Sequence, residues 1–220
     1  TEKAFDFKVW KQVYQFIKDE KFDIVHAHGT RAASNVFRAA KKAKVPMIYT
    51  VHGWSFHPDQ SFTVRKLREL SEKYITTKAD RTICVSKSNQ KDGLERFNMK
   101  RSQVIYNAVD IEKFNPSNNF TDVRAELGIA RDKTVFGYIV RLTGQKDPIN
   151  MLNAMKIVAK QADNAVLLIV GDGDMKEQAM AHAQSIGIAH KVVFESFRTD
   201  IPDVLNAIDV YVLPSLWEGF

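Results

Sequence analysis

The sequence predicts an α/β fold made of two units, each with a parallel sheet covered by helices. Short apolar runs typical of buried strands alternate with longer segments typical of helices along most of the chain. This alternation is interrupted once, at residues 107–119, which are rich in Asn, Pro and Ser. Residues 1–117 hold 22 Lys and Arg against 13 Asp and Glu, whereas residues 118–220 hold 10 against 13. We therefore expect two domains, residues 1–116 and 117–220.

The first domain is expected to contain four strands separated by helices. Each strand is a short apolar run, and two of them end in histidine. The expected strands are residues 22–28, 46–52, 81–86 and 104–106. The expected helices are residues 9–18, 31–44, 64–78 and a segment capped by Ser88.

The second domain repeats the pattern. Gly128 and Gly187 each follow a helical segment and are expected to end it. The expected strands are residues 134–140, 165–170, 192–194 and 210–213, and the expected helices are residues 122–127, 150–161, 175–186 and 201–207.

Composition excludes several classes of protein. A chain of 220 residues with 45% hydrophobic and 26% charged residues is typical of a globular protein. No apolar run approaches the roughly 20 residues that span a bilayer. Cys84 is the only cysteine, so no internal disulfide can form, which is compatible with a reduced, cytosolic setting. The basic first half is either a solvated surface or a surface for an anionic lipid leaflet or phosphate-bearing ligand. No nucleic-acid-binding motif accompanies it.

Polar residues follow the strands of the second domain, at the edge where parallel sheets bind ligands. Arg141 and Lys146 lie on either side of a loop containing Gly144, and together they suit a diphosphate, although ordinary solvation explains the pair alone. The Gly171-Asp-Gly173 turn precedes a helix and lacks the third glycine of a dinucleotide fingerprint. Neither a serine-hydrolase elbow nor an NTPase phosphate loop is present.

Carboxylate and imidazole groups also stand at strand ends. Glu218 lies on a tight turn after the last strand, where it can accept hydrogen bonds from sugar hydroxyls. His26, His28 and His52 end strands of the first domain, and three histidines suggest zinc. No cysteine cluster or other metal motif accompanies them, so we expect no metal site.

Several ordered motifs resemble glycosyltransferase family 4, the retaining nucleotide-sugar transferases of GT-B fold (glycosyl transferases group 1). The resemblance extends from about Phe22 to Phe220. It rests on His26-Ala-His-Gly, Thr50-Val-His-Gly-Trp, the segment 137–148, Val170-Gly-Asp-Gly, Phe197-Arg-Thr-Asp and Pro214-Ser-Leu-Trp-Glu-Gly-Phe. Val140 departs from the family, which more often has glycine before the arginine.

The resemblance implies two Rossmann-like domains facing a cleft, with the donor bound mainly by the second and the acceptor by the first. It implies that Arg141 and Lys146 hold the donor diphosphate. Gly171, Gly173 and Arg198 would form the donor and nucleobase loops. Glu218 and His52 would contact the transferred sugar, and His28 would line the acceptor side. It implies no cofactor, because the nucleotide-sugar is a substrate and the family needs no metal.

The resemblance also implies that both domains are incomplete. The family has a first strand with a glycine-rich loop that has no counterpart before Phe22, and a second glutamate eight positions after the one matched by Glu218. We therefore expect the chain to be a fragment truncated at both ends, with poor or absent activity on its own.

The expected function is retaining transfer of a sugar from a nucleotide-sugar, with UDP the expected nucleotide, to a glycan or lipid-linked acceptor in polysaccharide or glycoconjugate biosynthesis. The expected location is the cytoplasm, with peripheral binding to an anionic inner membrane face and without nucleic acid as a partner. The alternatives are a GT-B nucleotide-sugar epimerase or phosphorylase, and a non-catalytic basic binding module. Retention through a covalent intermediate and through a same-face ion pair both stay open.

Overall fold

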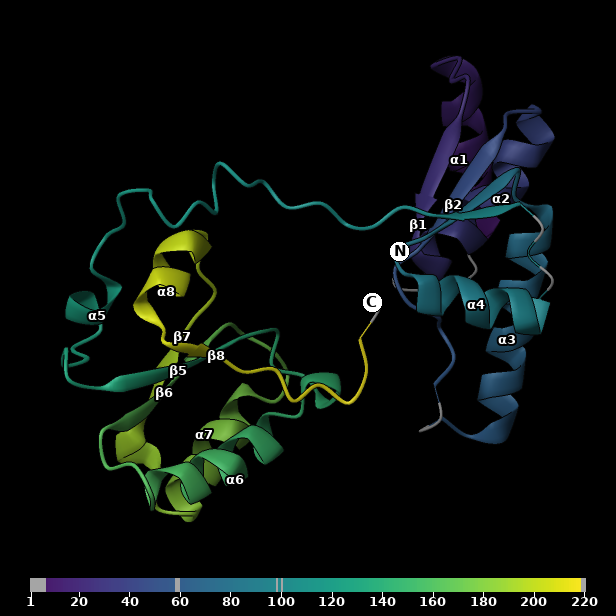
Figure 1. The fold of residues 1–220 in the computed structure, drawn as a ribbon. Helices are drawn as coiled ribbons and strands as arrows, with labels where there is room; N and C mark the ends of the chain where they lie inside the picture. Colours follow the sequence, from purple (N-terminus) through teal and green to yellow (C-terminus); the bar gives the residue numbers. More distant parts are fainter. Residues whose placement is uncertain (1–6, 58–59, 98, 100, 219–220) are drawn as a thin grey trace. The chain divides into compact units, whose positions relative to one another are not determined.

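The structure, a computed structural model, describes residues 7–57, 60–97, 99 and 101–218 (Figure 1). The chain forms two compact units, one reaching to Ala108 and the other spanning Val109–Trp217. Residues 105–122 connect the last strand of the first unit to the first helix of the second, and contain no helix or strand. The boundary near residue 116 stays a prediction, and any boundary within this connection separates the same elements.

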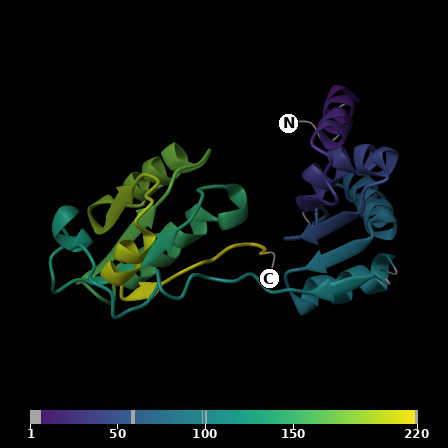
Figure 2. The same cartoon turned by 90° about the horizontal axis from the view of Figure 1, so that it is seen from above.

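The first unit is a four-stranded parallel sheet with strand order β1-β2-β3-β4 (Figures 1 and 2). Strands alternate with helices along the chain, as predicted. The elements are α1 (Phe7–Asp19), β1 (Val25–His28), α2 (Gly29–Ala43), β2 (Met47–Val51), α3 (Phe62–Lys78), β3 (Arg81–Cys84), α4 (Lys87–Phe97) and β4 (Ser102–Val104).

The second unit is also a four-stranded parallel sheet, with strand order β7-β6-β5-β8. Its helices and short 3₁₀ turns join successive strands. The elements are α5 (Val123–Glu126), β5 (Thr134–Ile139), η1 (Gly144–Lys146), α6 (Pro148–Ala159), β6 (Ala165–Val170), α7 (Lys176–Ser185), η2 (Ala189–Lys191), β7 (Val192–Glu195), α8 (Ile201–Ala207) and β8 (Val210–Tyr211).

Both faces of the second sheet are buried, which explains why β6 is apolar throughout. Successive residues of a strand point to opposite faces. Leu167 and Ile169 accordingly join a core with α6 and α7, while Leu168 and Val170 join a core with Val204 of α8. Figure 1 shows α6 and α7 on one side of this sheet and α5 and α8 on the other. The predicted α/β class with parallel sheets is confirmed.

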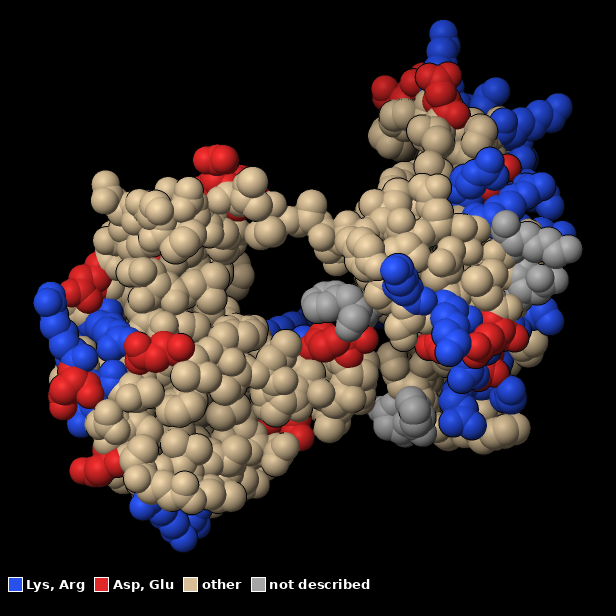
Figure 3. Space-filling model, viewed as in Figure 1, with Lys and Arg blue, Asp and Glu red and all other residues tan. Residues whose placement is uncertain are grey.

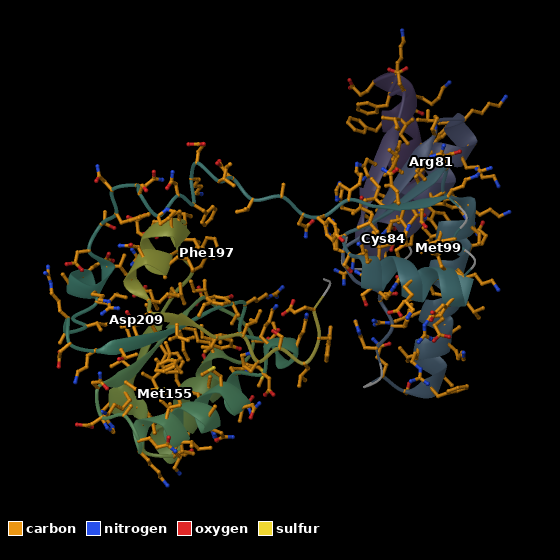
Figure 4. The ribbon with its side chains drawn as sticks, viewed as in Figure 1. Arg81, Cys84, Met99, Met155, Phe197 and Asp209 are labelled. Atoms are coloured by element: carbon orange, nitrogen blue, oxygen red, sulfur yellow. The ribbon has the colours of Figure 1, made fainter. Side chains whose placement is uncertain are left out.

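Asp209, labelled in Figure 4, fixes the short helix α5 against the sheet. Its carboxylate accepts hydrogen bonds from the backbone N–H of Val135 at 2.7 Å and from Arg124 of α5 at 2.8 Å. The hydrogen bond from Val135 and the Arg124 cation lower the pKa of this carboxyl. A four-residue helix has little stability of its own, so these contacts hold it in place.

Several predicted boundaries in the first unit differ from the structure by one to three residues. The strand predicted from residue 22 begins at Val25, because Phe22 and Ile24 are 41% and 51% exposed and are not paired with β2. The strand predicted at 104–106 is β4, at Ser102–Val104. Ser88 lies inside α4 and does not cap it. The residue that caps this helix is Ser86, whose hydroxyl accepts a hydrogen bond from the N–H of Asn89.

Among the described residues, none of the helices combines the length and the hydropathy required to cross a bilayer. The longest, α3, has 17 residues and carries charges along its length.

Cys84 should react slowly with thiol reagents in the folded chain. The side chain is fully buried in β3, and burial raises the pKa of the thiol to about 11. Since the thiolate is the reacting species, we expect labelling by a disulfide reagent at pH 8 to be about a hundredfold slower in native buffer than in denaturant. Because the chain has one cysteine, the absorbance of the thiol released from the reagent reports the reaction of Cys84 alone. Equal rates in the two conditions would contradict the burial.

Candidate functional site

The second unit contains a cavity of about 540 Å³ at the carboxyl ends of its strands. Parallel α/β sheets bind ligands at this edge. The wall is formed by the end of β5, the loops after β6 and β7, and the start of α8. The lining residues are Ile139, Val140, Arg141, Val170, Gly171, Asp172, Gly173, Phe197, Arg198 and Ile201. Four residues predicted from three strand ends, at positions 141, 171, 173 and 198, therefore line one cavity.

Arg141 offers an unused cation to this cavity. The residue is exposed, and no hydrogen bond or ion pair to its guanidinium is found in the part of the chain that the structure describes. A guanidinium presents a planar set of donors that matches phosphate oxygens. The arrangement suits an anionic ligand that lies against the end of β5.

Gly171 and Gly173 allow the loop after β6 to lie directly against the segment after β5. A Cβ atom at Gly171 would lie 2.0 Å from the carbonyl oxygen of Val140, and one at Gly173 would lie 2.1 Å from that of Leu142. Gly171 also has a positive φ of 133°, a conformation that other residues rarely adopt. The two glycines are thus required for the shape of the cavity floor.

Asp172 ties the loop after β6 to the loop after β7. Its carboxylate accepts hydrogen bonds from the backbone N–H of Phe197 at 2.9 Å and from Lys176 Nζ at 2.6 Å, and Lys176 also bonds Ser196. These donors lower the pKa of the carboxyl, the Lys176 hydrogen bond most. Phe197, labelled in Figure 4 beside α8, lines the cavity and is 74% exposed. An exposed aromatic ring at a cavity can stack against a planar ligand.

Arg198 lines the same cavity, but its charge is already compensated. Its guanidinium donates to both carboxylate oxygens of Asp200 and to both of Glu126 in α5. Four of its five N–H donors are engaged, and these partners raise its pKa. Arg198 therefore positions α5 and the start of α8, and it contributes the face of its side chain to the cavity wall.

Lys146 is absent from the cavity lining and lies on η1, in a loop held at two points. The Tyr138 hydroxyl donates to the Lys146 carbonyl at 2.6 Å. Gln145 bonds the segment that leads to Glu218: its carbonyl accepts from the N–H of Leu216 at 2.9 Å, and its side-chain amide donates to the Trp217 carbonyl at 2.8 Å. Residues 216 and 217 are thereby fixed to the loop that carries Lys146. The next residue, Glu218, is half-buried.

In the first unit, the three strand-end histidines lie next to one another. His28 Nδ1 lies 2.9 Å from His52 Nε2, and His26 Nε2 lies 2.7 Å from the Thr50 hydroxyl. In the hydrogen bond between His28 and His52, one ring nitrogen donates its proton and the other accepts. The accepting nitrogen therefore carries no proton. Burial and the neighbouring His28 and His52 lower the pKa of His26.

The described residues contain no group of three or more His, Cys, Asp or Glu side chains placed to hold a metal ion. The ring centroids of His26 and His28 lie 4.2 Å apart with the rings tilted by 35°, and the rings of His28 and His52 are stacked with centroids 5.2 Å apart. One nitrogen of each ring is directed to Thr50 or His52.

Glu72 organises the segment around His52, although in the sequence it is an ordinary glutamate within a predicted helix. The side chain is fully buried and accepts hydrogen bonds from Thr30 at 2.5 Å, from Tyr49 at 2.9 Å and from the N–H of Ser55 at 3.2 Å. It thereby joins α3 to the start of α2, to β2 and to the loop after His52. Burial and this carboxylate raise the pKa of Tyr49 well above its usual range.

Two family models match the chain. The model for Glycosyltransferase Family 4 matches residues 2–113, and the model for Glycosyl transferases group 1 matches residues 119–220. The chain is 33% identical to UDP-Gal:alpha-D-GlcNAc-diphosphoundecaprenol alpha-1,3-galactosyltransferase of Escherichia coli, over 97% of this chain and 57% of that protein. It is 27% identical to D-inositol 3-phosphate glycosyltransferase of Mycobacterium marinum, over 90% of this chain and 45% of that protein.

The fold is similar to that of solved structures over nearly the whole chain. Anabaena Alr3699/HepE in complex with UDP and glucose matches with a TM-score of 0.83 at 21% identity, over all of this chain and 60% of that one. A sucrose-phosphate synthase from Thermosynechococcus elongatus matches with a TM-score of 0.77 at 20% identity, over 97% of this chain and 57% of that one. The chain spans about half the length of the curated relatives it matches.

Replacing Gly173 with alanine should destabilise the second unit. The new Cβ would meet the Leu142 carbonyl, a backbone atom that cannot turn away. We expect the free energy of unfolding to fall by about 1–3 kcal/mol in urea titrations. Gly144→Ala is the matched control, because nothing lies within 4 Å of the Cβ it would add. Equal effects of the two substitutions would show that the close approach is not needed.

Replacing Glu72 with leucine should destabilise the first unit. The hydroxyls of Thr30 and Tyr49 and the N–H of Ser55 would lose their shared acceptor. We expect a loss of about 2–4 kcal/mol in the free energy of unfolding. The control is Glu95→Leu on α4, whose side chain is 63% exposed, with an expected change within about 0.5 kcal/mol. A Glu72 variant as stable as the control would exclude this role.

Proposed function

The chain belongs to glycosyltransferase family 4, with the GT-B fold, and from that premise we propose that its protein transfers a sugar from a UDP-sugar to a lipid-linked or glycan acceptor with retention of anomeric configuration. Two of its relatives and one similar solved structure carry the name of a glycosyltransferase. The donor nucleotide, the acceptor and the individual roles of the residues are our proposals.

One observation carries the proposal: the cavity at the carboxyl edge of the second sheet, where Arg141, beside Gly171 and Gly173, has no partner among the residues that the structure describes. A volume of about 540 Å³ accommodates a ligand of nucleotide size. The exposed ring of Phe197 provides a surface for a base, and Arg141 provides a cation for a phosphate. UDP in the similar Anabaena structure agrees with this class of ligand.

Arg141 and Lys146 are proposed to stabilise the diphosphate as it leaves. When the bond between the anomeric carbon and the diphosphate breaks, negative charge accumulates on the leaving oxygen. Fixed cations lower the barrier most when they are already in place. The Lys146 loop meets this requirement, because Tyr138 and Gln145 hold its backbone.

Glu218 and His52 are proposed to contact the transferred sugar, and His28 to lie on the acceptor side. The carboxylate suits sugar hydroxyls, and the bonds of Gln145 to residues 216 and 217 would fix its approach. The hydrogen bond between His28 and His52 holds the orientation of both rings. In the reaction, the acceptor oxygen forms the new bond to the anomeric carbon, and its proton passes to the departing diphosphate.

The acceptor is proposed to be a phosphate-linked lipid or glycan used at the cytoplasmic face of a membrane, in polysaccharide or glycoconjugate biosynthesis. The relative from Escherichia coli is named for a diphosphoundecaprenol acceptor. The excess of Lys and Arg in residues 1–117 suits such an anionic ligand and an anionic membrane surface. Figure 3 shows these blue side chains gathered over the helices of the first unit.

Arg141→Gln should reduce transfer in the full-length protein. Loss of a charged hydrogen bond to the diphosphate predicts a fall of about 10- to 100-fold in kcat/KM for a UDP-sugar. The assay is a panel of UDP-sugars, with release of UDP and the product's anomeric configuration as readouts. Arg131→Gln is the matched control, because that side chain is 92% exposed on the same unit.

The outcomes separate the proposed function from its alternatives. Absence of UDP-sugar binding and of transfer would exclude the transferase. An epimerised nucleotide-sugar as the product would identify an epimerase of the same fold. A fall in kcat/KM for Arg131→Gln equal to that for Arg141→Gln would exclude the assignment of the diphosphate site to this cavity.

A further inference from the structure

The first unit contains a cavity of its own, of about 620 Å³, that the sequence did not indicate. It lies where β1 ends and α2 begins, and α3 forms its far wall. His28, Gly29 and Arg31 line one side, and Val64, Leu67 and Arg68 line the other. The cavity therefore has a polar wall and a partly apolar wall.

The polar wall is suited to phosphate groups. Arg31 is exposed, and its guanidinium has no hydrogen bond or ion pair among the described residues. Arg68 reaches the same cavity, and one of its nitrogens donates to the Ser55 carbonyl at 2.6 Å. Among the described residues, no side chain caps the N-terminus of the 15-residue helix α2 that begins here. Two guanidinium groups beside the first backbone N–H groups of this helix form a positive site for a bulky anion.

The other wall continues into an exposed apolar stripe along α3. Val64 and Leu67 line the cavity and are 40% and 68% exposed. Leu70 and Tyr74 follow on the same side of the helix, at 62% and 48% exposed. Helix residues facing water are usually polar, so four large apolar side chains in register indicate contact with an apolar chain.

The cavity also reaches a proposed catalytic group. His28 lines the cavity, and its Nδ1 atom lies 2.9 Å from Nε2 of His52. A ligand with its phosphates at Arg31 and Arg68 would therefore place its next group beside the histidine pair.

We propose that this cavity binds the carrier of the acceptor, a sugar linked through a diphosphate to a long lipid, with the diphosphate at Arg31 and Arg68 and the first part of the lipid along Val64, Leu67 and Leu70. The proposal rests on the proposed function, which it deepens by assigning the acceptor to named residues. Charge complementarity and the continuity between the cavity and the stripe favour one amphiphilic molecule over a purely polar glycan.

The experiment compares two acceptors that share a head group. One is N-acetylglucosaminyl diphosphate on undecaprenol, and the other carries the same diphosphate on an ethyl group. In the full-length protein, Arg31→Gln should raise the KM for both acceptors by about tenfold, because both have the diphosphate. Leu67→Ser combined with Leu70→Ser should raise the KM for the undecaprenyl acceptor alone. The KM for the UDP-sugar reports the donor site separately.

Two matched controls test whether the effects are local. Arg81→Gln removes an exposed arginine at the amino end of β3, labelled in Figure 4, away from the carboxyl edge that holds the cavity. Leu94→Ser removes a leucine that is 45% exposed on α4. Neither should change the KM for either acceptor. Equilibrium binding of the ethyl diphosphate, measured without donor, gives a second readout that does not require turnover.

The failures are distinguishable. Unchanged binding and KM in Arg31→Gln would overturn this inference, even if UDP-sugar binding and transfer continue. If the leucine variant loses only its binding to phosphatidylglycerol vesicles, with both KM values unchanged in detergent, the stripe binds a bilayer and the inference is wrong. A leucine variant that instead changes only the sedimenting mass would identify a surface for a second copy. Absence of UDP-sugar binding in the unaltered protein would overturn the proposed function itself.

Discussion

The close approach of two backbone segments determines the geometry of the cavity in the second unit. The Leu142 N–H donates to the Asp172 carbonyl, and the Leu142 carbonyl accepts from the Met175 N–H, so the segment after β5 lies in direct contact with the loop after β6. Only glycine fits at positions 171 and 173 in this arrangement. The contact directs Arg141 to the cavity and sets the start of α7, from which Lys176 reaches Asp172.

In the first unit, a buried side chain holds the segments at the sheet edge together. The carboxylate of Glu72 joins four segments. In the second unit, backbone hydrogen bonds join the segment after β5 to the loop after β6, and the Asp172 carboxylate joins that loop to the one after β7. A buried carboxylate is costly unless every oxygen is hydrogen-bonded, and here three donors from three segments meet that need. The two units therefore both have a four-stranded parallel sheet, but they differ in strand order and in what positions the loops at the sheet edge.

The alternation of strands and helices, and the residues that stand at strand ends, could be predicted because both follow from local patterns of apolar residues. The structure places Arg141, Gly171, Gly173 and Arg198 around one cavity for this reason. The pairing of Arg198 with Glu126 could not be predicted, since the two residues are 72 positions apart in sequence.

Other features depend on contacts that leave no periodic signal. Glu72 has the sequence context of an exposed helical glutamate, yet it is fully buried. Gln145 lies between two more conspicuous residues, and its importance arises from a hydrogen bond to a residue 72 positions later. Ser86 and Ser88 are equivalent as caps in sequence, and the helix start at Lys87 decides between them.

The two hydrogen bonds of Gln145 have a thermodynamic consequence for any donor. These two bonds couple the η1 loop to residues 216 and 217. A ligand that orders one of the two segments would therefore also order the other. Under the proposed function, the nucleotide and the sugar of one donor would then bind cooperatively, each lowering the entropic cost of the other. After the proposed transfer, the two halves of the donor would be separate molecules, and this mutual stabilisation would be lost. The same pair of bonds would thus favour both the capture of an intact donor and the release of its fragments.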